Sequence, residues 1–300
     1  MTGRFPGGGG FSLLRLAPMV LRARGFRLYA RGGGASGKRR LVDLWQNGGA
    51  AVLGHTPPSM LRELKNAASR GLFAPFPHFL EDRLAKALSR VFPDRDFALY
   101  AAPPPELEAL AASGAAGLWR PFLDPAAPLS APENAPPVLA LVVPGVQGWR
   151  LAKGPRGAEI ALPLGLCALA IGRGFERGRL PPGDFLPPAL LAAAARGVHD
   201  LVAAAPLRSR PAFPRIAKAL RGVPPEASMW KSRGPYLEPR RPVSREGWAA
   251  LFRRYLDAGF LLPPAPCQPL ILPGELSPGE EAKLAGLLAP EADFSKGPLD

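Results

Sequence analysis

The sequence predicts an α/β protein in which short apolar strands alternate with amphipathic helices. Leu41 to Trp45 and Val138 to Val143 are apolar runs of strand length, and prolines bound the second, as expected for a buried parallel strand. Between them, apolar residues recur every three or four positions from Met60 to Leu72 and again from Phe79 to Val91. A chain of 300 residues with 47% hydrophobic content is long enough to bury such a core.

The helix ends follow from proline, glycine and capping residues. Pro57 and Pro58 predict the first turn of one helix, and Gly71 predicts its end. Near the C-terminus, Ser244 and Ser277 predict helix starts, because each offers a capping hydroxyl. The remaining predicted elements are a strand at Phe97 to Tyr100, a short helix at Glu106 to Ala116, loops at Pro121 to Pro137 and Gly145 to Gly157, a strand pair or buried segment at Ile160 to Ile171, helices at Pro188 to Ala204, Arg215 to Arg221, Ser244 to Ala258 and Ser277 to Leu288, and short strands at Phe260 to Leu262 and Pro269 to Leu272.

The charge is strongly basic but dispersed along the sequence. The formal net charge is +14, and 30 of the 38 basic residues are arginines that stand singly. Specific nucleic-acid binding needs a stripe of basic residues with interleaved aromatic residues, or a known module, and the sequence shows neither. Diffuse charge of this kind favours weak binding of anions.

The cysteines and histidines predict no metal site. Cys167 and Cys267 are far apart, which predicts neither a disulfide framework nor a zinc site and fits a reducing compartment. His55, His78 and His199 stand singly, without clustered ligands and without a nucleophile pattern around them. No GxGxxG, Walker, GxSxG or HExxH motif is present.

The N-terminal segment does not read as a membrane span. The apolar part of Phe11 to Val20 is interrupted by Arg15 and Pro18, and it is too short to cross a bilayer. We therefore expect a cytoplasmic protein without a membrane partner.

Five motifs follow one another in the N-terminal part of the chain. They are, in order, Arg22 to Tyr29 (RARGFRLY), Leu41 to Trp45 (LVDLW), Leu53 to Pro58 (LGHTPP) and Phe79 to Leu88 (FLEDRLAKAL) before Val91 to Pro93 (VFP). This series resembles the class III aminotransferases, the pyridoxal-phosphate (PLP) enzymes of fold type I, and most closely the glutamate-1-semialdehyde aminotransferase branch. The C-terminal block from Ser244 to Leu288 is similar to the small domain of these enzymes.

The resemblance implies a two-domain architecture. It predicts a shortened fold type I large domain with a mostly parallel sheet, joined to a small α+β domain. The expected divisions are residues 1–58 as an N-terminal segment that contributes to the small domain, residues 59–205 as the shortened large domain, and residues 206–300 as the C-terminal small domain.

The resemblance also implies four cofactor contacts: a phosphate cup, a lysine that forms the Schiff base, an acid against the pyridine nitrogen and an aromatic face. The aromatic element belongs between Ala116 and Val138, a stretch too short to contain it. At the cup positions the chain has Pro103, Pro104, Pro105, Glu106 and Leu107. Proline has no N–H, so three donors for a dianionic phosphate are missing there.

The lysine and the acid are missing from the aligned positions as well. The lysine position falls on Ile160, next to Glu159, and the nearest lysine is Lys153 in a polar loop. The acid should end the strand Val138 to Val143, where Pro144, Gly145 and Val146 follow instead.

The sequence therefore predicts a degenerate class III aminotransferase-like protein that is not catalytic and binds no PLP. We expect no catalytic, cofactor-binding or metal-binding residues. Such a protein would act by binding, or as the homo- or hetero-dimer partner of an active aminotransferase-like chain, without specific nucleic acid. The alternative is a PLP-dependent aminotransferase or aminomutase with Lys153 as a displaced lysine. A weaker alternative is a basic protein that binds anions or nucleic acid.

Overall fold

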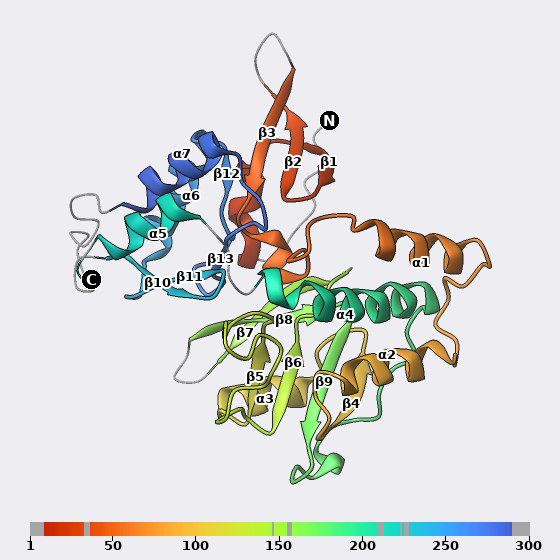
Figure 1. Ribbon diagram of the computed structural model, residues 1–300. Coiled ribbons are helices and arrows are strands. Elements are labelled where there is room, and N and C mark those ends of the chain that lie inside the picture. Colours follow the sequence, from red (N-terminus) through yellow and green to blue (C-terminus); the bar gives the residue numbers. More distant parts are fainter. Residues whose placement is uncertain are drawn as a thin grey trace. The chain divides into compact units, whose positions relative to one another are not determined.

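A computed structural model describes residues 9–32, 37–145, 147–154, 158–208, 213–222, 224 and 228–289 (Figure 1). The chain forms two compact units. The first unit comprises residues 1–45 and 211–300, and the second comprises residues 46–210.

The described residues of the first unit form two small sheets, three α-helices and one 3-10 helix. Strands β1 (Val20–Arg24), β2 (Arg27–Arg31) and β3 (Lys38–Asp43) form an antiparallel meander, and β12 (Phe260–Leu261) adds to β3 in parallel. Strands β10 (Trp230–Arg233), β11 (Tyr236–Pro239) and β13 (Leu270–Ile271) form an antiparallel sheet. The helical elements are η1 (Gly9–Leu16), α5 (Pro214–Arg221), α6 (Arg245–Asp257) and α7 (Pro278–Leu288).

Helices α6 and α7 close the core of the first unit. Trp248, Phe252 and Tyr255 lie on the buried face of α6 and pack with Leu41 of β3. Both predicted caps are present: Ser244 accepts the N–H of Gly247, and Ser277 forms a capping box with Glu280.

The second unit is built around a four-stranded sheet in the order β4-β9-β6-β5. The strands are β4 (Arg95–Tyr100), β5 (Ala116–Trp119), β6 (Val138–Leu141) and β9 (Cys167–Gly172). A hairpin of β7 (Gly148–Lys153) and β8 (Glu159–Leu164) lies between β6 and β9 in the sequence. The helical elements are η2 (Gln46–Gly49), α1 (Pro58–Ala68), α2 (Leu80–Ser89), α3 (Pro105–Ala112), η4 (Arg177–Arg179) and α4 (Pro188–Arg208).

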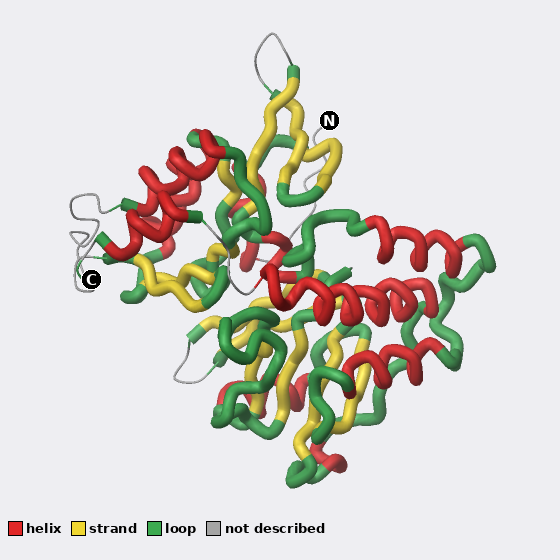
Figure 2. Tube along the Cα trace, in the orientation of Figure 1, coloured by secondary structure: helices red, strands yellow, loops and turns green. Residues whose placement is uncertain are grey.

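Both faces of this sheet are covered, as Figure 2 shows. Alternate residues of β6 point to opposite faces. Leu139 and Leu141 pack with α2 and α4, whereas Val138 and Ala140 pack with α3 and the β7–β8 hairpin. Every residue of β6 is therefore buried, as the apolar run in the sequence predicts.

The prediction of a mostly parallel sheet is wrong at the level of strand pairing. Strand β5 pairs with β6 in parallel, but β9 pairs antiparallel with both β4 and β6. The β7–β8 hairpin connects the end of β6 to the start of β9, and it returns the chain to the end of the sheet where β6 finishes. Strand β9 therefore runs in the direction opposite to β6. The sheet is mixed, with β4, β5 and β6 running the same way and β9 reversed between β4 and β6.

The predicted loop at Gly145 to Gly157 contains strand β7, which is a second correction. Trp149 and Ala152 are buried, while the residues between and around them are exposed or half-buried. Glycine, lysine and arginine at the other positions hide this pattern from a sequence reading. Strands β5, β10 and β11 are also short, and the sequence does not predict them.

Residues 46–58, which the sequence reading groups with the N-terminal segment, pack with the second unit. The N–H of Gly145, just past β6, donates to the carbonyl oxygen of Ala50 at 3.2 Å. Helix α4 also extends beyond its predicted end, from Ala204 to Arg208. By length and composition α4 could cross a membrane, but half of its apolar stretch is buried inside the protein, as in a core helix. The cytoplasmic location stays a prediction.

Candidate functional site

The C-terminal ends of β4 and β6 meet at one edge of the sheet in the second unit. The two strands run in the same direction, because each pairs antiparallel with β9 between them. Tyr100 and Leu141, at the strand ends, lie opposite Cys167 and Ala168 at the start of β9. The family resemblance places the cofactor contacts here, and we call this region the sheet edge.

Helix α3, which follows β4 at the sheet edge, begins with prolines. Pro104 is the N-cap residue and Pro105 the first helical residue. The N–H of Leu107 donates to the carbonyl oxygen of Pro104 at 3.0 Å. A helix N-terminus binds anions through free N–H groups, and proline has none. The first turn of α3 therefore offers an anion fewer N–H donors than a helix that begins without prolines.

Gln147 fills the space beyond β6. Its side chain is only 3% exposed. Its Oε1 accepts the N–H of Val143 at 3.1 Å, and its Nε2 donates to the carbonyl oxygens of Leu141 at 3.2 Å and Leu166 at 2.8 Å. The amide thus ties the end of β6 to the segment that leads into β9. A neutral amide lies near the strand end where the resemblance requires an acid.

The β7–β8 hairpin and the turn at Gln46–Gly49 pack against the same region. The indole Nε1 of Trp149 donates to the carbonyl oxygen of Asn47 at 2.7 Å, and Nδ2 of Asn47 donates to the carbonyl oxygen of Gln147 at 2.6 Å. A Cβ on Gly48 would lie 2.4 Å from the indole of Trp149. The protein's own side chains therefore occupy this part of the sheet edge.

Two buried titratable groups at the sheet edge stay neutral near pH 7. Burial raises the pKa of the Cys167 thiol to about 12. Burial also raises the pKa of Tyr100, whose hydroxyl donates to the carbonyl oxygen of Pro181 at 2.8 Å. Neither group is poised to act as a nucleophile or a base.

The structure brings Lys153, Glu159 and Ile160 together in the β7–β8 hairpin. Lys153 is exposed at the end of β7, paired in register with Glu159, and Ile160 is half-buried in β8. Pro144 and Gly145 follow β6, and Val146 lies outside the described residues.

The histidines are not brought together. His78 Nδ1 accepts the N–H of Leu80 at 3.3 Å, and His199 Nδ1 lies 3.4 Å from the guanidinium of Arg90. Burial, followed by the charge of Arg90, lowers the pKa of His199. In the part of the chain that the structure describes, no group of three or more His, Cys, Asp or Glu side chains could hold a metal.

Sequence reasoning missed Asn47, Gln147 and Trp149. Gln147 and Trp149 lie in what reads as a loop. The nearest sequence signal is Asn47 followed by Gly48 and Gly49, since asparagine and glycine favour the left-handed backbone that this turn adopts, with a φ of 48° at Asn47 and 65° at Gly48.

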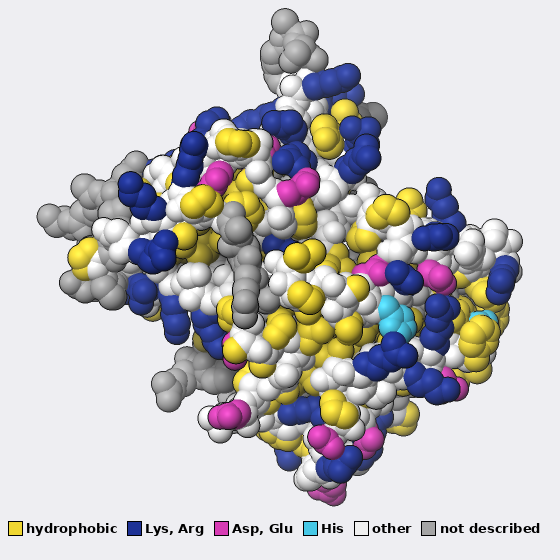
Figure 3. Space-filling model, in the orientation of Figure 1, with side chains coloured by type: hydrophobic (Ala, Val, Ile, Leu, Met, Phe, Trp, Pro, Cys, Tyr) yellow, Lys and Arg dark blue, Asp and Glu magenta, His cyan; other side chains and the backbone are white. Residues whose placement is uncertain are grey.

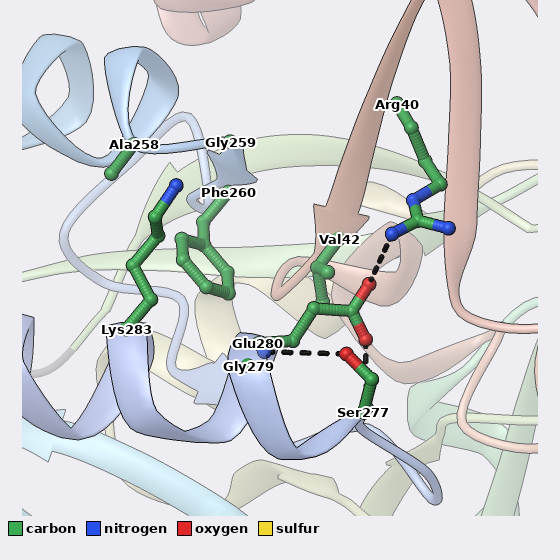
Figure 4. Close-up of a pocket in the computed structure, with 9 residues that line it drawn as sticks. All are labelled: Arg40, Val42, Ala258, Gly259, Phe260, Ser277, Gly279, Glu280 and Lys283. Carbon is green, nitrogen blue, oxygen red and sulfur yellow. Dashed lines mark hydrogen bonds and ion pairs between the residues drawn. The ribbon is translucent and has the colours of Figure 1, made fainter.

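The first unit contains a pocket of about 420 Å³ (Figure 4). Val42, Ala258 and Phe260 form apolar walls, and Arg40, Glu280 and Lys283 contribute charges. Figure 4 shows Glu280 pointing toward Arg40 and Ser277, with Lys283 beside Phe260.

Glu280 is held by two arginines. Arg27 donates to both of its carboxylate oxygens, at 3.1 and 2.8 Å, and Arg40 lies 3.4 Å away. Partial burial alone would raise the pKa of Glu280, but the hydrogen bonds from Arg27 and Ser277 lower it to about 2. The carboxylate is therefore charged and already paired at neutral pH.

A comparison of sequences finds a relative that matches most of the chain. No family model matches the chain. An uncharacterized protein of Treponema pallidum is 32% identical over 292 residues, which cover 87% of this chain and 91% of the relative.

Solved structures with similar folds include several aminotransferases. Ornithine aminotransferase from Plasmodium yoelii has a TM-score of 0.58 at 10% identity, covering 90% of this chain and 92% of that one. N-acetylornithine aminotransferase from Stenotrophomonas maltophilia has a TM-score of 0.56 at 15% identity, covering 93% and 97%. A transaminase solved with PLP bound has a TM-score of 0.57 at 12% identity, covering 90% and 89%. These similarities establish the aminotransferase-like fold.

The expectation that no cofactor is involved is contradicted by these neighbours. They are aminotransferases, and one was solved with PLP. PLP is therefore the cofactor that this fold implies. That the chain is shortened and degenerate stays a prediction.

Proposed function

The chain belongs to one family with the uncharacterized Treponema pallidum protein and has an aminotransferase-like fold, yet we propose that it acts by binding rather than by catalysing amino-group transfer. What we propose to be absent is catalysis of amino-group transfer. The proposal leaves PLP as a ligand that the fold implies.

The observation that carries the proposal is the position of the lysines in the second unit. Residues 46–210 contain three lysines: Lys65, Lys86 and Lys153. All three side chains are exposed, on α1, on α2 and at the end of β7. A lysine that attacks a carbonyl as a free amine is usually desolvated or placed next to another cation. None of the three is buried at the sheet edge.

The hydrogen-bond donors at the sheet edge do not match the PLP contacts that the family resemblance implies. Pro103, Pro104 and Pro105 provide no N–H for the phosphate. Gln147 presents an amide beyond β6, and its polar atoms are engaged by Leu141, Val143 and Leu166.

An amino-transfer assay tests the proposal. The protein is incubated with saturating PLP, ¹⁵N-labelled ornithine or N-acetylornithine as donor and a 2-oxo acid as acceptor, and ¹⁵N in the acceptor is measured by mass spectrometry. We expect no transfer above a protein-free control, while an active aminotransferase run in parallel labels the acceptor. Transfer that disappears in Lys153→Ala would instead establish the displaced-lysine alternative.

We also propose that the protein pairs with a second aminotransferase-like chain, either another copy or a paralogue. Three large apolar side chains on the α1–α2 connection support this: Phe73, Phe76 and Phe79 are 64%, 51% and 65% exposed. Exposed aromatic side chains gathered in one short segment are typical of protein interfaces.

A further inference from the structure

Folding gathers six of the nine basic residues within residues 1–45 on one face of a sheet. Nine basic residues and one acidic residue lie within residues 1–45. In the register of β1, β2 and β3, Arg22 lies opposite Tyr29, which lies opposite Arg40. Residues two apart on a strand share a face. This face, which we call the cationic face, comprises Arg22, Arg24, Arg27, Tyr29, Arg31, Lys38 and Arg40.

The cationic face is turned to solvent. The alternate residues Leu28, Ala30 and Leu41 are buried on the opposite face of the sheet. Arg24 and Arg31 are exposed, together with Arg22, Lys38 and Arg40. In Figure 3, Lys and Arg side chains gather over the part of the molecule where Figure 1 places β1 to β3.

Most of these cations are not neutralised within the protein. Arg27 is bonded to Glu275 and Glu280, each at 2.8 Å, and Arg40 approaches Glu280. Among the described residues, no carboxylate forms an ion pair with Arg24, Arg31 or Lys38.

The cationic face also has a flat aromatic element. The guanidinium of Arg22 lies over the ring of Tyr29, 4.4 Å from its centroid. The pocket described above adjoins the face through Arg40, and its walls Val42 and Phe260 are apolar. Lys283, also in the pocket, makes no ion pair with a described residue.

We propose that the cationic face binds single-stranded nucleic acid without sequence preference, with one base entering the adjoining pocket. Neighbouring side chains on the face are spaced about 7 Å along each strand and about 5 Å between strands, so several can contact one phosphate backbone. Sequence-independent binding of single strands combines such cations with aromatic or guanidinium planes on which bases stack. The face belongs to the first unit and uses no residue of the sheet edge, so its test is independent of the amino-transfer assay.

Fluorescence anisotropy with a labelled 20-nucleotide poly(U) RNA, at 50 to 300 mM KCl, measures the binding. The test variant is Arg24→Ala/Arg31→Ala/Lys38→Ala. The matched control is Arg62→Ala/Lys65→Ala/Arg70→Ala, which removes the same charge from exposed positions on and just after α1. We expect the test variant to bind at least tenfold more weakly, with a salt slope smaller by about 2, because each phosphate contact to a single strand contributes about 0.7. The control should bind like the wild type.

A third variant, Lys283→Ala, examines the pocket. It should weaken binding several-fold without unfolding the protein, since the side chain is exposed. Equal loss in both triple variants would overturn the proposal, because binding would then follow net charge alone. Absence of RNA binding would overturn it as well, and binding to anionic phosphatidylglycerol vesicles without RNA binding would assign the face to a membrane surface instead.

Discussion

Single residues decide what the sheet edge can do. Gln147 closes it with three hydrogen bonds, and the prolines at the start of α3 remove donors that an anion would need. The loss of donors at the prolines could be predicted from the sequence, because proline lacks a backbone N–H in any structure. The role of Gln147 could not, because its partners Leu141 and Leu166 become neighbours only when β6 and β9 pair.

Replacing Gln147 by leucine should destabilise the protein by about 2–4 kcal/mol, because the N–H of Val143 and two carbonyl groups would remain buried without partners. Urea unfolding followed by circular dichroism measures the loss. Lys153→Ala serves as the surface control and should change the free energy of unfolding by less than about 0.5 kcal/mol. A neutral effect of Gln147→Leu would contradict the network described here.

Glu280 should make stability depend on pH in the acid range. Its folded pKa of about 2 lies below the ordinary value of 4.5, so its contribution is present above about pH 4.5 and is lost as the pH falls toward 2. We expect a loss on the order of 1–2 kcal/mol, since the pair with Arg27 is partly exposed to solvent.

Urea unfolding at pH 5, 4 and 3 compares wild type with Glu280→Gln, which retains a capping residue at that position of α7. The stability difference between the two proteins should shrink as the pH falls. If the stability difference stays constant from pH 5 to 3, the Arg27–Glu280 pair is not its source.

At the scale of elements, helices were more predictable than strands. The capping box at Ser277 and Glu280 and the proline start of α1 are local signals, and the structure confirms both. Strand β5 has only four residues, and β7 has six but carries no continuous apolar pattern, so neither gives a clear local signal. Because the hairpin containing β7 precedes β9, β9 runs antiparallel to its neighbours and the sheet is mixed. A local sequence pattern does not reveal strand direction.

The contact between Trp149 and Gly48 tests whether the hairpin is held to the turn at Gln46–Gly49. Gly48 and Gly71 both have positive φ, 65° and 74°, but only a Cβ at position 48 would meet another residue, Trp149. Gly48→Ala should therefore cost about 2–4 kcal/mol, and Gly71→Ala about 1 kcal/mol from backbone strain alone. Thermal and urea unfolding of the two variants measure the difference. Equal costs would mean that the indole does not lie on Gly48 in solution.

At the scale of the whole molecule, the order of the elements predicted an α/β aminotransferase-like fold, which the solved aminotransferases confirm, but the predicted mostly parallel sheet is mixed. The charge distribution was not predictable in the same way. Arg22, Tyr29 and Arg40 are separated along the sequence and become neighbours only through strand pairing. Residues that read as diffuse charge thus form a continuous face.

The pairing proposal predicts self-association or capture of a paralogue through the α1–α2 connection. In analytical ultracentrifugation the wild type should sediment as a dimer at micromolar concentration, and Phe73→Ser/Phe79→Ser should shift it toward monomer without loss of helical signal, because both rings are exposed. Leu16→Ser/Leu21→Ser, which changes exposed apolar residues in the first unit, is the control. A monomer that also fails to pair with any coexpressed aminotransferase-like chain would contradict the proposal.

The central claim is that an aminotransferase-like fold is retained here without a lysine placed for transfer chemistry. Borohydride reduction at saturating PLP, followed by peptide mass spectrometry, tests it most directly. The account predicts that the pyridoxyl modification of Lys65, Lys86 and Lys153 in the folded protein does not exceed that in the urea-unfolded protein. Binding of PLP without a covalent bond is compatible with the account. Stoichiometric pyridoxyl modification of one of these lysines in the folded protein would contradict it.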